Sequence, residues 1–314
     1  MPVHTSYQRH PLKSLIYLLL LMFAGAIVFA IIGIVLGFAF FNLRLSDLSE
    51  PLNAQNSEIL NAFKVIQVLS TIGTFIVPAM IFAKIEEQDI PGYLKFNFSQ
   101  PLTLFLLSAL VIIASVPLLE WAITYNENIH FPVSLKWLEN WMRAQEDKMD
   151  DQVKALLVMH TPGELIINLF MIAIIPAIGE EFFFRGCLQT TLLRWFKNTH
   201  AAVWVTAIIF SAIHMQFLGF IPRMLLGAIL GYLFVWGKSI WLPVAAHFTN
   251  NAVSVLAAYY NQKKGADIEH MDQVAQFHWY HYLLSAIFTG AILFAFYQLA
   301  VTKKALSSDG ERLD

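Results

Sequence analysis

From Ser14 to Leu43 the chain reads SLIYLLLLMFAGAIVFAIIGIVLGFAFFNL, an apolar stretch without a single charged side chain. About 20 apolar residues are enough for a helix to cross the hydrocarbon core of a bilayer. The apolar core of a cleaved signal peptide is only about 7–15 residues long. This stretch is therefore predicted to be a retained membrane span rather than a signal peptide.

The composition of the whole chain agrees with a membrane protein. Of its 314 residues, 57% are hydrophobic and 13% are charged, whereas soluble domains carry about 25% charged residues. The net charge of −2 provides no broad basic face, so nucleic acid is not expected as a partner. Cys187 is the only cysteine, which excludes an intramolecular disulfide and a cysteine-based zinc site. The lipid bilayer is the partner that this composition predicts.

Further apolar stretches predict an all-α fold, a polytopic transmembrane helical bundle of about eight spans. After residues 14–43 they cover residues 65–83, 96–119, 165–179, 201–221, 224–237, 239–262 and 279–302. The fourth stretch is short and is expected to continue as helix through the charged segment Glu180–Arg185.

Lys and Arg residues in the short loops predict the orientation, because cytoplasmic loops are enriched in them. These residues are Arg9, Lys13, Lys84, Lys95, Arg185, Arg194, Lys197, Lys238, Lys303, Lys304 and Arg312. With eight spans all of them fall on one side. The chain is thus predicted to lie in the cell (inner) membrane with both termini in the cytoplasm.

The one long loop, residues 126–162, lies on the opposite, outer side in this topology. Its apolar residues recur at helical spacing, namely Trp137, Leu138, Trp141, Met142, Val153, Leu156 and Leu157. Asp and Glu occupy the other face, which indicates an amphipathic helix on the outer surface of the bundle. A packed connector is the favoured interpretation, and a gate or substrate-recognition element is the alternative.

A small set of polar residues is predicted at bilayer depth. Of ten histidines, only His214 and His247 lie well inside apolar stretches, and Glu180 and Glu181 are the only acids between residues 165 and 262. An ionisable group inside a span costs roughly 2.5–3.5 kcal/mol on insertion scales. Such residues are therefore candidates for function, although a single histidine in a span more often forms an interhelical hydrogen bond.

Helical spacing gives these residues different directions. Glu181 and Arg185 are four residues apart and share a helix face, whereas Glu180 points about 100° away. His247 and Asn251 share another face. Taken alone, a Glu–Arg pair is more often structural, but the combined set suits hydrolysis, because a desolvated carboxylate is a competent base and imidazole or carboxamide groups can donate to an oxyanion. Gly227 and Gly231 are predicted to serve helix packing alone.

Three motifs resemble those of a known family. The segment EEFFFRG, residues 180–186, is similar to the EExxxR motif of the CPBP (CAAX protease and bacteriocin-processing, Abi) family, which includes the type II CAAX prenyl endopeptidases. FSAIH at residues 210–214 resembles the family's FxxxH motif, and HFTNN at residues 247–251 resembles its HxxxN/B motif. The three occur in the family's order, within less than a third of the chain.

The resemblance implies an intramembrane endopeptidase that opens to the cytoplasm and acts on a membrane-associated peptide or protein, possibly a CAAX-type or leader-peptide substrate. Glu180 would activate water with the help of His214, while His247 and Asn251 would stabilise the oxyanion. Glu181 and Arg185 would hold the helix. The cofactor is none or a divalent metal such as zinc; if a metal is required, Glu180, His214 and His247 would bind it. The metal-free mechanism is favoured.

The chain then divides into three regions. Residues 1–163 form an N-terminal transmembrane region of three spans plus the outer loop, residues 164–262 the CPBP-like catalytic membrane core, and residues 263–314 the last span and a cytoplasmic tail. A proton-coupled transporter and a catalytically idle immunity or scaffold protein of the same fold are the alternative functions. The expected depths of the two histidines fit a common site poorly. Helical rise places His247 about 13 Å and His214 about 25 Å from the cytoplasmic end.

Overall fold

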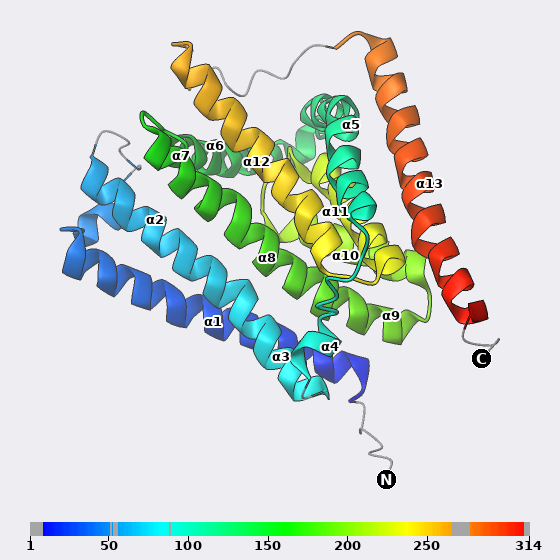
Figure 1. Ribbon diagram of the computed structural model, residues 1–314. Coiled ribbons are helices and arrows are strands. Elements are labelled where there is room, and N and C mark those ends of the chain that lie inside the picture. Colours follow the sequence, from blue (N-terminus) through cyan, green and yellow to red (C-terminus); the bar gives the residue numbers. More distant parts are fainter. Residues whose placement is uncertain (1–8, 51, 53–55, 88, 266–276, 311–314) are drawn as a thin grey trace.

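The structure is a bundle of helices with both termini at the same end (Figure 1). The computed structural model describes residues 9–50, 52, 56–87, 89–265 and 277–310, with the side chains of residues 302–310 outside this description. No strand occurs among the described residues. The predicted all-α fold is confirmed. The side chains of Lys303 and Lys304, and the whole of Arg312, which entered the orientation prediction, lie outside the described part of the chain.

The first part of the chain forms α1 (Pro11–Phe40), η1 (Leu45–Leu48), α2 (Ser57–Thr71), η2 (Ile72–Ile76), α3 (Val77–Glu87), α4 (Ile90–Tyr93), α5 (Leu102–Glu127), η3 (Val133–Leu135) and α6 (Lys136–Leu156). The second part forms α7 (Pro162–Asn168), η4 (Leu169–Ile174), α8 (Ile175–Glu181), η5 (Phe182–Gln189), α9 (Thr190–Phe196), α10 (Thr199–Ile213), α11 (Phe220–Gly237), α12 (Trp241–Lys263) and α13 (Trp279–Gly310). The segments η2, η4 and η5 are π-helical. They join their neighbours into two long continuous helices, α2–α3 and α7–α9.

Within the described part of the chain, six helices are long and apolar enough to cross a membrane: α1, α2–α3, α5, α7–α9, α11 and residues 279–301 of α13. The chain is therefore an integral, multi-pass membrane protein. The helix α7–α9 runs from Pro162 to Phe196, so the predicted continuation through the charged segment is confirmed. The other two predicted spans correspond to α10, which is apolar but short, and α12, which carries the polar residues of the third motif.

Helix α10 is shorter than the predicted stretch 201–221 because the chain turns after Ile213. Its 15 residues span about 22 Å, less than the roughly 30 Å of a hydrocarbon core. The His214 Nδ1 atom lies 2.7 Å from the carbonyl oxygen of Phe210, and Met215 adopts a left-handed conformation with φ of 56°. His214 therefore lies at a helix end within the bundle.

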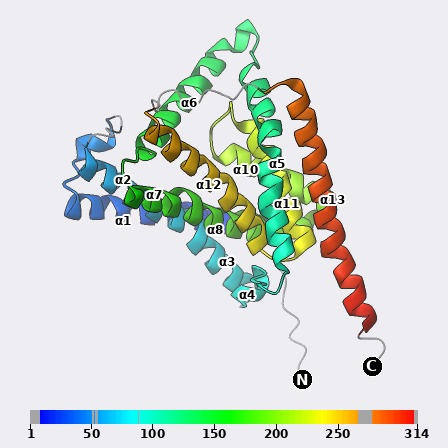
Figure 2. The ribbon, with the colours of Figure 1, turned by 45° about the horizontal axis from the view of Figure 1, so that its top comes forward.

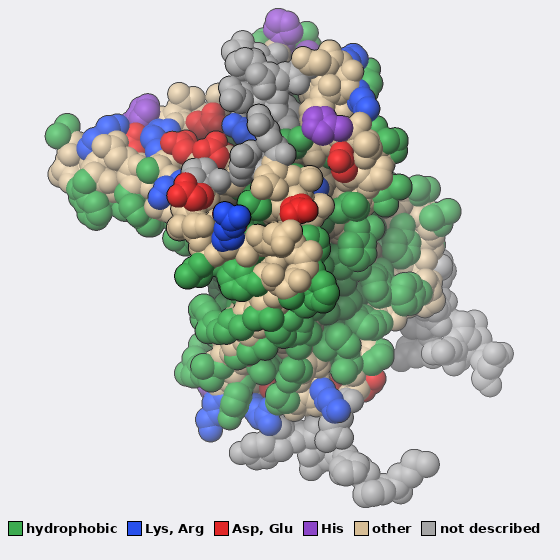
Figure 3. Space-filling model, turned by 90° about the vertical axis from the view of Figure 1, so that its left-hand side faces the viewer, with side chains coloured by type: hydrophobic (Ala, Val, Ile, Leu, Met, Phe, Trp, Pro, Cys, Tyr) green, Lys and Arg blue, Asp and Glu red, His purple; other side chains and the backbone are tan. Residues whose placement is uncertain are grey.

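The two ends of the bundle differ in their charged groups. At one end, the start of α1 meets the ends of α3 and α9, where Glu86 lies 3.7 Å from Arg9 and 2.9 Å from Arg194. The backbone N–H of Ile240, just before α12, donates to the Lys95 carbonyl oxygen. Figure 3 shows an apolar band with charged side chains gathered above and below it. Arg9 and Arg194, two of the basic residues used to predict orientation, thus lie at this end, whereas Arg185 is fully buried inside the bundle rather than in a loop.

Helix α6 extends along the opposite end of the bundle (Figure 2). Its Trp137 is 69% exposed, yet Glu139 and Glu146 are buried. Glu139 is held inside because it binds His130, Lys136, Arg143 and the backbone of Phe131. Hydrogen bonds, first from His130 and then from Lys136 and the Phe131 backbone, lower the pKa of Glu139. The predicted outer helix exists, but two of its acids face inward rather than water.

Helices α10 and α11 approach closely at two glycines. A Cβ atom on Gly231 would lie 2.8 Å from Gln189 Oε1 and 2.9 Å from Val203 Cγ1. A Cβ on Gly227 would contact Ala207 and Phe210 at 3.2 Å. The predicted packing role of Gly227 and Gly231 is confirmed, and it brings α11 against the helix that carries the two glutamates.

Candidate functional site

The helix that carries Glu180 is irregular for a reason that its sequence explains. Pro176 has no backbone N–H and cannot donate to Ile172, four residues before it. The side chain of Asn251, in α12, donates from Nδ2 to the Ile172 carbonyl oxygen at 3.1 Å. Asn250 donates in turn to Asn251 Oδ1. Asn251 therefore attaches α12 to the π-helical segment η4, which continues into α8 and its Glu180.

Glu181 and Arg185 form the predicted ion pair. Arg185 Nη1 lies 2.7 Å from Glu181 Oε1, and both side chains are fully buried. Arg185 Nη2 donates to the Gly227 carbonyl at 3.0 Å, and the guanidinium lies over the Phe210 ring at 4.7 Å. Gly227 thus has a second role that spacing did not reveal, as an acceptor for the buried arginine. Cys187, on the same turn, is fully buried and its thiol contacts the Ala79 carbonyl.

The two histidines face Glu180 with the same ring nitrogen. His247 Nδ1 lies 2.8 Å from Glu181 Oε1, and His214 Nδ1 lies 2.7 Å from the Phe210 carbonyl. Both partners only accept hydrogen bonds, so each Nδ1 must carry a proton. Each Nε2 is then directed at Glu180 Oε2, at 3.9 Å in both cases. The structure thus brings together all three predicted ionisable groups.

Glu180 Oε2 is the carboxylate oxygen that faces both imidazoles. It is buried without a hydrogen-bond partner, although buried carboxylate oxygens are normally satisfied. Glu181 Oε2 and Arg185 Nε, in the same cluster, are also buried without a partner. A separation of 3.9 Å is too long for a direct hydrogen bond, but it suits one water about 2.8 Å from both atoms, at an angle of about 90°. The site therefore has the dimensions to hold a water between the carboxylate and an imidazole.

The same distances test a metal ion. Two ligands at about 2.1 Å from tetrahedral zinc lie roughly 3.4 Å apart, closer than the 3.9 Å found for both histidines. Among the described residues, no group of three or more His, Cys, Asp or Glu side chains is placed to hold a metal. The donor types suit zinc, but this arrangement fits water without adjustment.

The two imidazoles have different neighbours. His247 contacts the carboxylates of both Glu180 and Glu181. His214 contacts the Glu180 carboxylate and is bound to the neutral Phe210 carbonyl. His247 therefore lies in the more negative surroundings.

The different depths expected for the two histidines are reconciled by where α12 begins. Its first residue, Trp241, packs against Phe182 with ring centroids 5.9 Å apart. Phe182 is 14 residues before the end of α9 at Phe196, or about 21 Å along the helix. Helix α12 thus starts beside the middle of α7–α9. His247, six residues after Trp241, therefore lies next to Glu181.

Two polar residues near the site were not identified from the sequence. Gln189 is 1% exposed and donates to the Gly231 carbonyl at 3.1 Å. Arg223 separates two apolar stretches and reads as a loop charge, yet it belongs to α11 and lies close enough to Glu180 to interact electrostatically. Its position after Pro222, which can occupy a first helical turn, was the available signal.

The comparison with known families concerns the part of the chain that contains this site. Residues 162–253 match the family described as type II CAAX prenyl endopeptidase Rce1-like. The segment is similar to Rce1-like proteins. This Rce1-like segment contains Glu180, His214, His247 and Asn251, and it begins at α7. The resemblance suggested by the three motifs is therefore confirmed for this segment.

One curated relative is similar over part of the chain. The chain is 30% identical over 92 residues to the "Uncharacterized protein YpbD" of Bacillus subtilis (strain 168), a match that covers 28% of this chain and 44% of that protein. The chain thus spans less than half the length of that relative. No solved structure matches.

Proposed function

We propose that the protein is an intramembrane endopeptidase that hydrolyses a peptide bond of a membrane-associated substrate. The observation that carries the proposal is the buried, unpartnered Glu180 Oε2, which lies 3.9 Å from the Nε2 atoms of His214 and His247. Each of these separations fits one bridging water. A water held there lies within reach of a carboxylate that can accept its proton, as general-base hydrolysis requires.

In the proposed reaction Glu180 accepts a proton from the water while the water oxygen attacks the carbonyl carbon of the peptide. His214 accepts a hydrogen bond from that water through Nε2, since its Nδ1 is occupied by Phe210. The carbonyl oxygen becomes an oxyanion in a tetrahedral intermediate. When the C–N bond breaks, the proton held by Glu180 passes to the leaving amine, and a carboxylic acid and an amine are released.

The oxyanion is proposed to be stabilised by His247 and Asn251. A protonated His247 donates from Nε2 while its Nδ1 remains bound to Glu181. Asn251 uses one hydrogen of its Nδ2 group for the Ile172 carbonyl, which leaves the second for the substrate. Glu181 and Arg185 act as positioning residues: Glu181 orients the His247 ring through Nδ1, and Arg185 anchors Glu181 to α11 through Gly227.

The substrate proposed is a peptide or protein at the membrane, of CAAX type or a leader peptide, because the Rce1-like segment resembles prenyl endopeptidases. We further propose a location in the cell (inner) membrane with cytoplasmic termini, based on the basic residues at one end of the bundle. A divalent metal at Glu180, His214 and His247 is the alternative to metal-free hydrolysis.

The test compares new protein N-termini in membranes that contain the wild type with those that contain the Glu180→Gln variant. Gln keeps the shape and hydrogen-bonding groups of the side chain but cannot accept the proton. Cleavage products present only with the wild type are expected, and purified protein should reproduce them on a synthetic peptide. Identical N-termini in both membranes would refute the proposal and favour an idle scaffold. Loss of proton-coupled uptake in the variant, without any lost cleavage product, would favour a transporter.

A further inference from the structure

The loop that follows His214 is held by polar side chains from three helices, and we propose that this contact positions His214 for catalysis. We call residues 215–219 the His214 loop, and Asn126, Glu146, Asp150 and Arg223 the clamp. The proposal rests on the proposed role of His214 in hydrolysis. It assigns a function to α5 and α6, which lie outside the Rce1-like segment.

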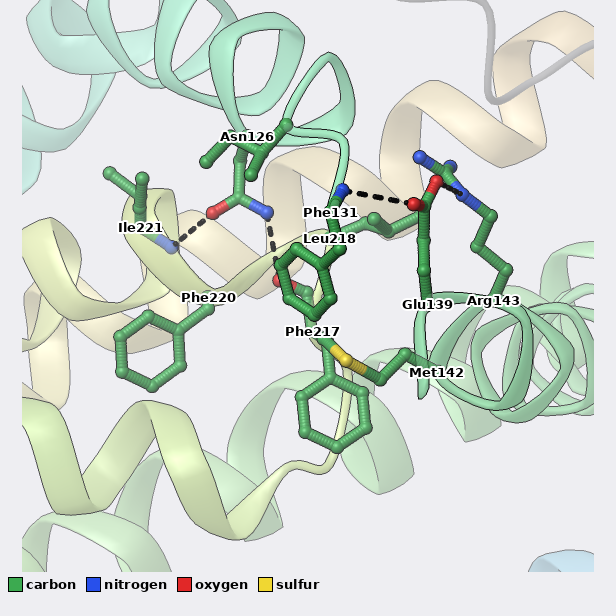
Figure 4. A pocket seen from close by; sticks show the side chains of 10 residues that line it. Asn126, Phe131, Glu139, Met142, Arg143, Phe217, Leu218, Phe220 and Ile221 are labelled. Carbon is green, nitrogen blue, oxygen red and sulfur yellow. Dashed lines mark hydrogen bonds and ion pairs between the residues drawn. The ribbon is translucent and has the colours of Figure 1, made fainter. Parts of the chain in front are cut away.

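Helix α5 contributes one residue to the clamp. Asn126, 6% exposed, donates from Nδ2 to the Phe217 carbonyl at 2.8 Å and accepts the N–H of Ile221 on Oδ1 at 3.2 Å. Figure 4 shows this amide between the two backbone groups. Both polar atoms of one side chain thus fix the far end of the His214 loop to the end of α5.

Helix α6 contributes two acids. Glu146 is 7% exposed and accepts the Leu218 backbone N–H at 2.7 Å. Asp150, one turn later, accepts from Gln216 Nε2 at 3.1 Å. Burying a carboxylate is costly unless its hydrogen bonds are satisfied. The hydrogen bond to the loop therefore explains why Glu146 is buried although it lies on a surface helix. Trp141 of the same helix packs on Phe217, with ring centroids 5.6 Å apart.

Arg223 links the clamp to the site. It donates from Nη1 to the Gln216 carbonyl at 3.2 Å and from Nη2 to Gln216 Oε1 at 2.7 Å. Gly219 leaves room for it, because a Cβ there would lie 2.7 Å from Nη2. Arg223 interacts electrostatically with Glu146, Asp150 and Glu180. It thus connects the acids of the clamp with the proposed base.

The His214 ring depends on the clamp because it lies at the end of α10, where the helix gives no further support. Met215 follows in a left-handed conformation, which a non-glycine residue adopts only when its surroundings enforce it. On its own helix the ring contacts Phe210, whose carbonyl oxygen lies 2.7 Å from Nδ1 and whose ring packs edge to face with centroids 4.9 Å apart. Displacing the loop moves Nε2 of His214 away from the water position, and misplacement by about 1 Å can cost about a hundredfold in rate.

The experiment uses the full-length protein in detergent with Glu146→Ala, Glu146→Gln and Asn126→Ala. Gln retains an oxygen that can accept the Leu218 N–H, so Glu146→Gln is the conservative rescue. Asp147→Asn is the matched control, because Asp147 is exposed on the same helix. Amide hydrogen exchange of residues 214–221 and the rate of His214 modification by diethyl pyrocarbonate are measured without a substrate. The kcat and KM values for a peptide substrate are measured separately.

We expect Glu146→Ala to raise exchange in residues 214–221 by about tenfold or more and to change the modification rate of His214. The kcat value should fall about ten- to a hundredfold, with KM within about threefold. Glu146→Gln and Asp147→Asn should resemble the wild type. If Glu146→Ala does not fold, Asn126→Ala, on another helix, should give the same pattern.

Unchanged exchange and unchanged His214 modification in folded Glu146→Ala or Asn126→Ala would overturn the proposal. A rise in KM with constant kcat would also overturn it, because the loop would then bind substrate rather than position His214. Increased exchange and altered His214 modification, together with a wild type that cleaves nothing, would refute the proposed function while leaving the clamp in place.

Discussion

Replacing each of the two adjacent glutamates by Gln distinguishes their proposed roles. Glu180 is proposed to accept a proton in catalysis, and Glu181 to form a structural ion pair. Glu181 is fully buried, 2.7 Å from Arg185 and 2.8 Å from His247. Glu181→Gln leaves Arg185 with no neighbouring carboxylate at hydrogen-bond distance. Breaking a buried pair in this way costs about 3–5 kcal/mol, and at roughly 2–4 °C per kcal/mol for a large domain the melting temperature should fall by on the order of 10 °C.

Glu180→Gln should affect stability far less, because Oε2 makes no hydrogen bond that would be lost. We expect a change of less than about 1 kcal/mol together with loss of turnover. Peptide cleavage and the helix melting curve, followed by circular dichroism in detergent, are measured for both variants. A stable but inactive Glu181→Gln beside a fully active Glu180→Gln would reverse the two roles. Normal cleavage by both would refute the protease proposal.

Three further predictions concern the metal, the orientation and the helix packing. After exhaustive chelation the protein should keep most of its peptidase activity; one zinc per chain, with activity lost on stripping and restored on readdition, would make Glu180 a metal ligand. Reporters fused within residues 126–162 should be active on the outer side, whereas reporters after Lys197 should not, and the opposite pattern would invert the topology. Gly231→Leu should lower expression and should lower the melting temperature by several degrees, because a Cβ there would already lie within 3 Å of Gln189 and Val203. Gly290→Leu serves as the control, because no atom lies within 4 Å of a Cβ at that position.

Local spacing predicted the features that depend on a single helix. The Glu181–Arg185 pair, the separate direction of Glu180 and the continuation of the fourth apolar stretch all follow from helical geometry, and the structure contains each of them. The apolar stretches likewise predicted the helices, because the length of an uncharged run is a direct measure of what can cross a bilayer.

Features that depend on how helices meet were beyond such reasoning. The early end of α10 results from a left-handed Met215 and from contacts made by residues about 70–95 positions away. The attachment of Asn251 to Ile172 compensates for Pro176 on another helix, so spacing around His247 gave no sign of it. Glu146 looked like part of a solvated acidic face, because nothing in α6 itself indicates an inward acceptor for Leu218.

The burial of Cys187 has a practical consequence for work on this protein. The only thiol of the chain is fully enclosed two residues after Arg185, so a thiol-reactive fluorogenic dye should remain dark until this particular helix opens. Heating the protein with such a dye would report the opening of η5 directly, in micrograms of detergent extract and without a substrate. Cysteines introduced on the exposed surface would in turn be labelled selectively, because the buried Cys187 of the folded protein does not react.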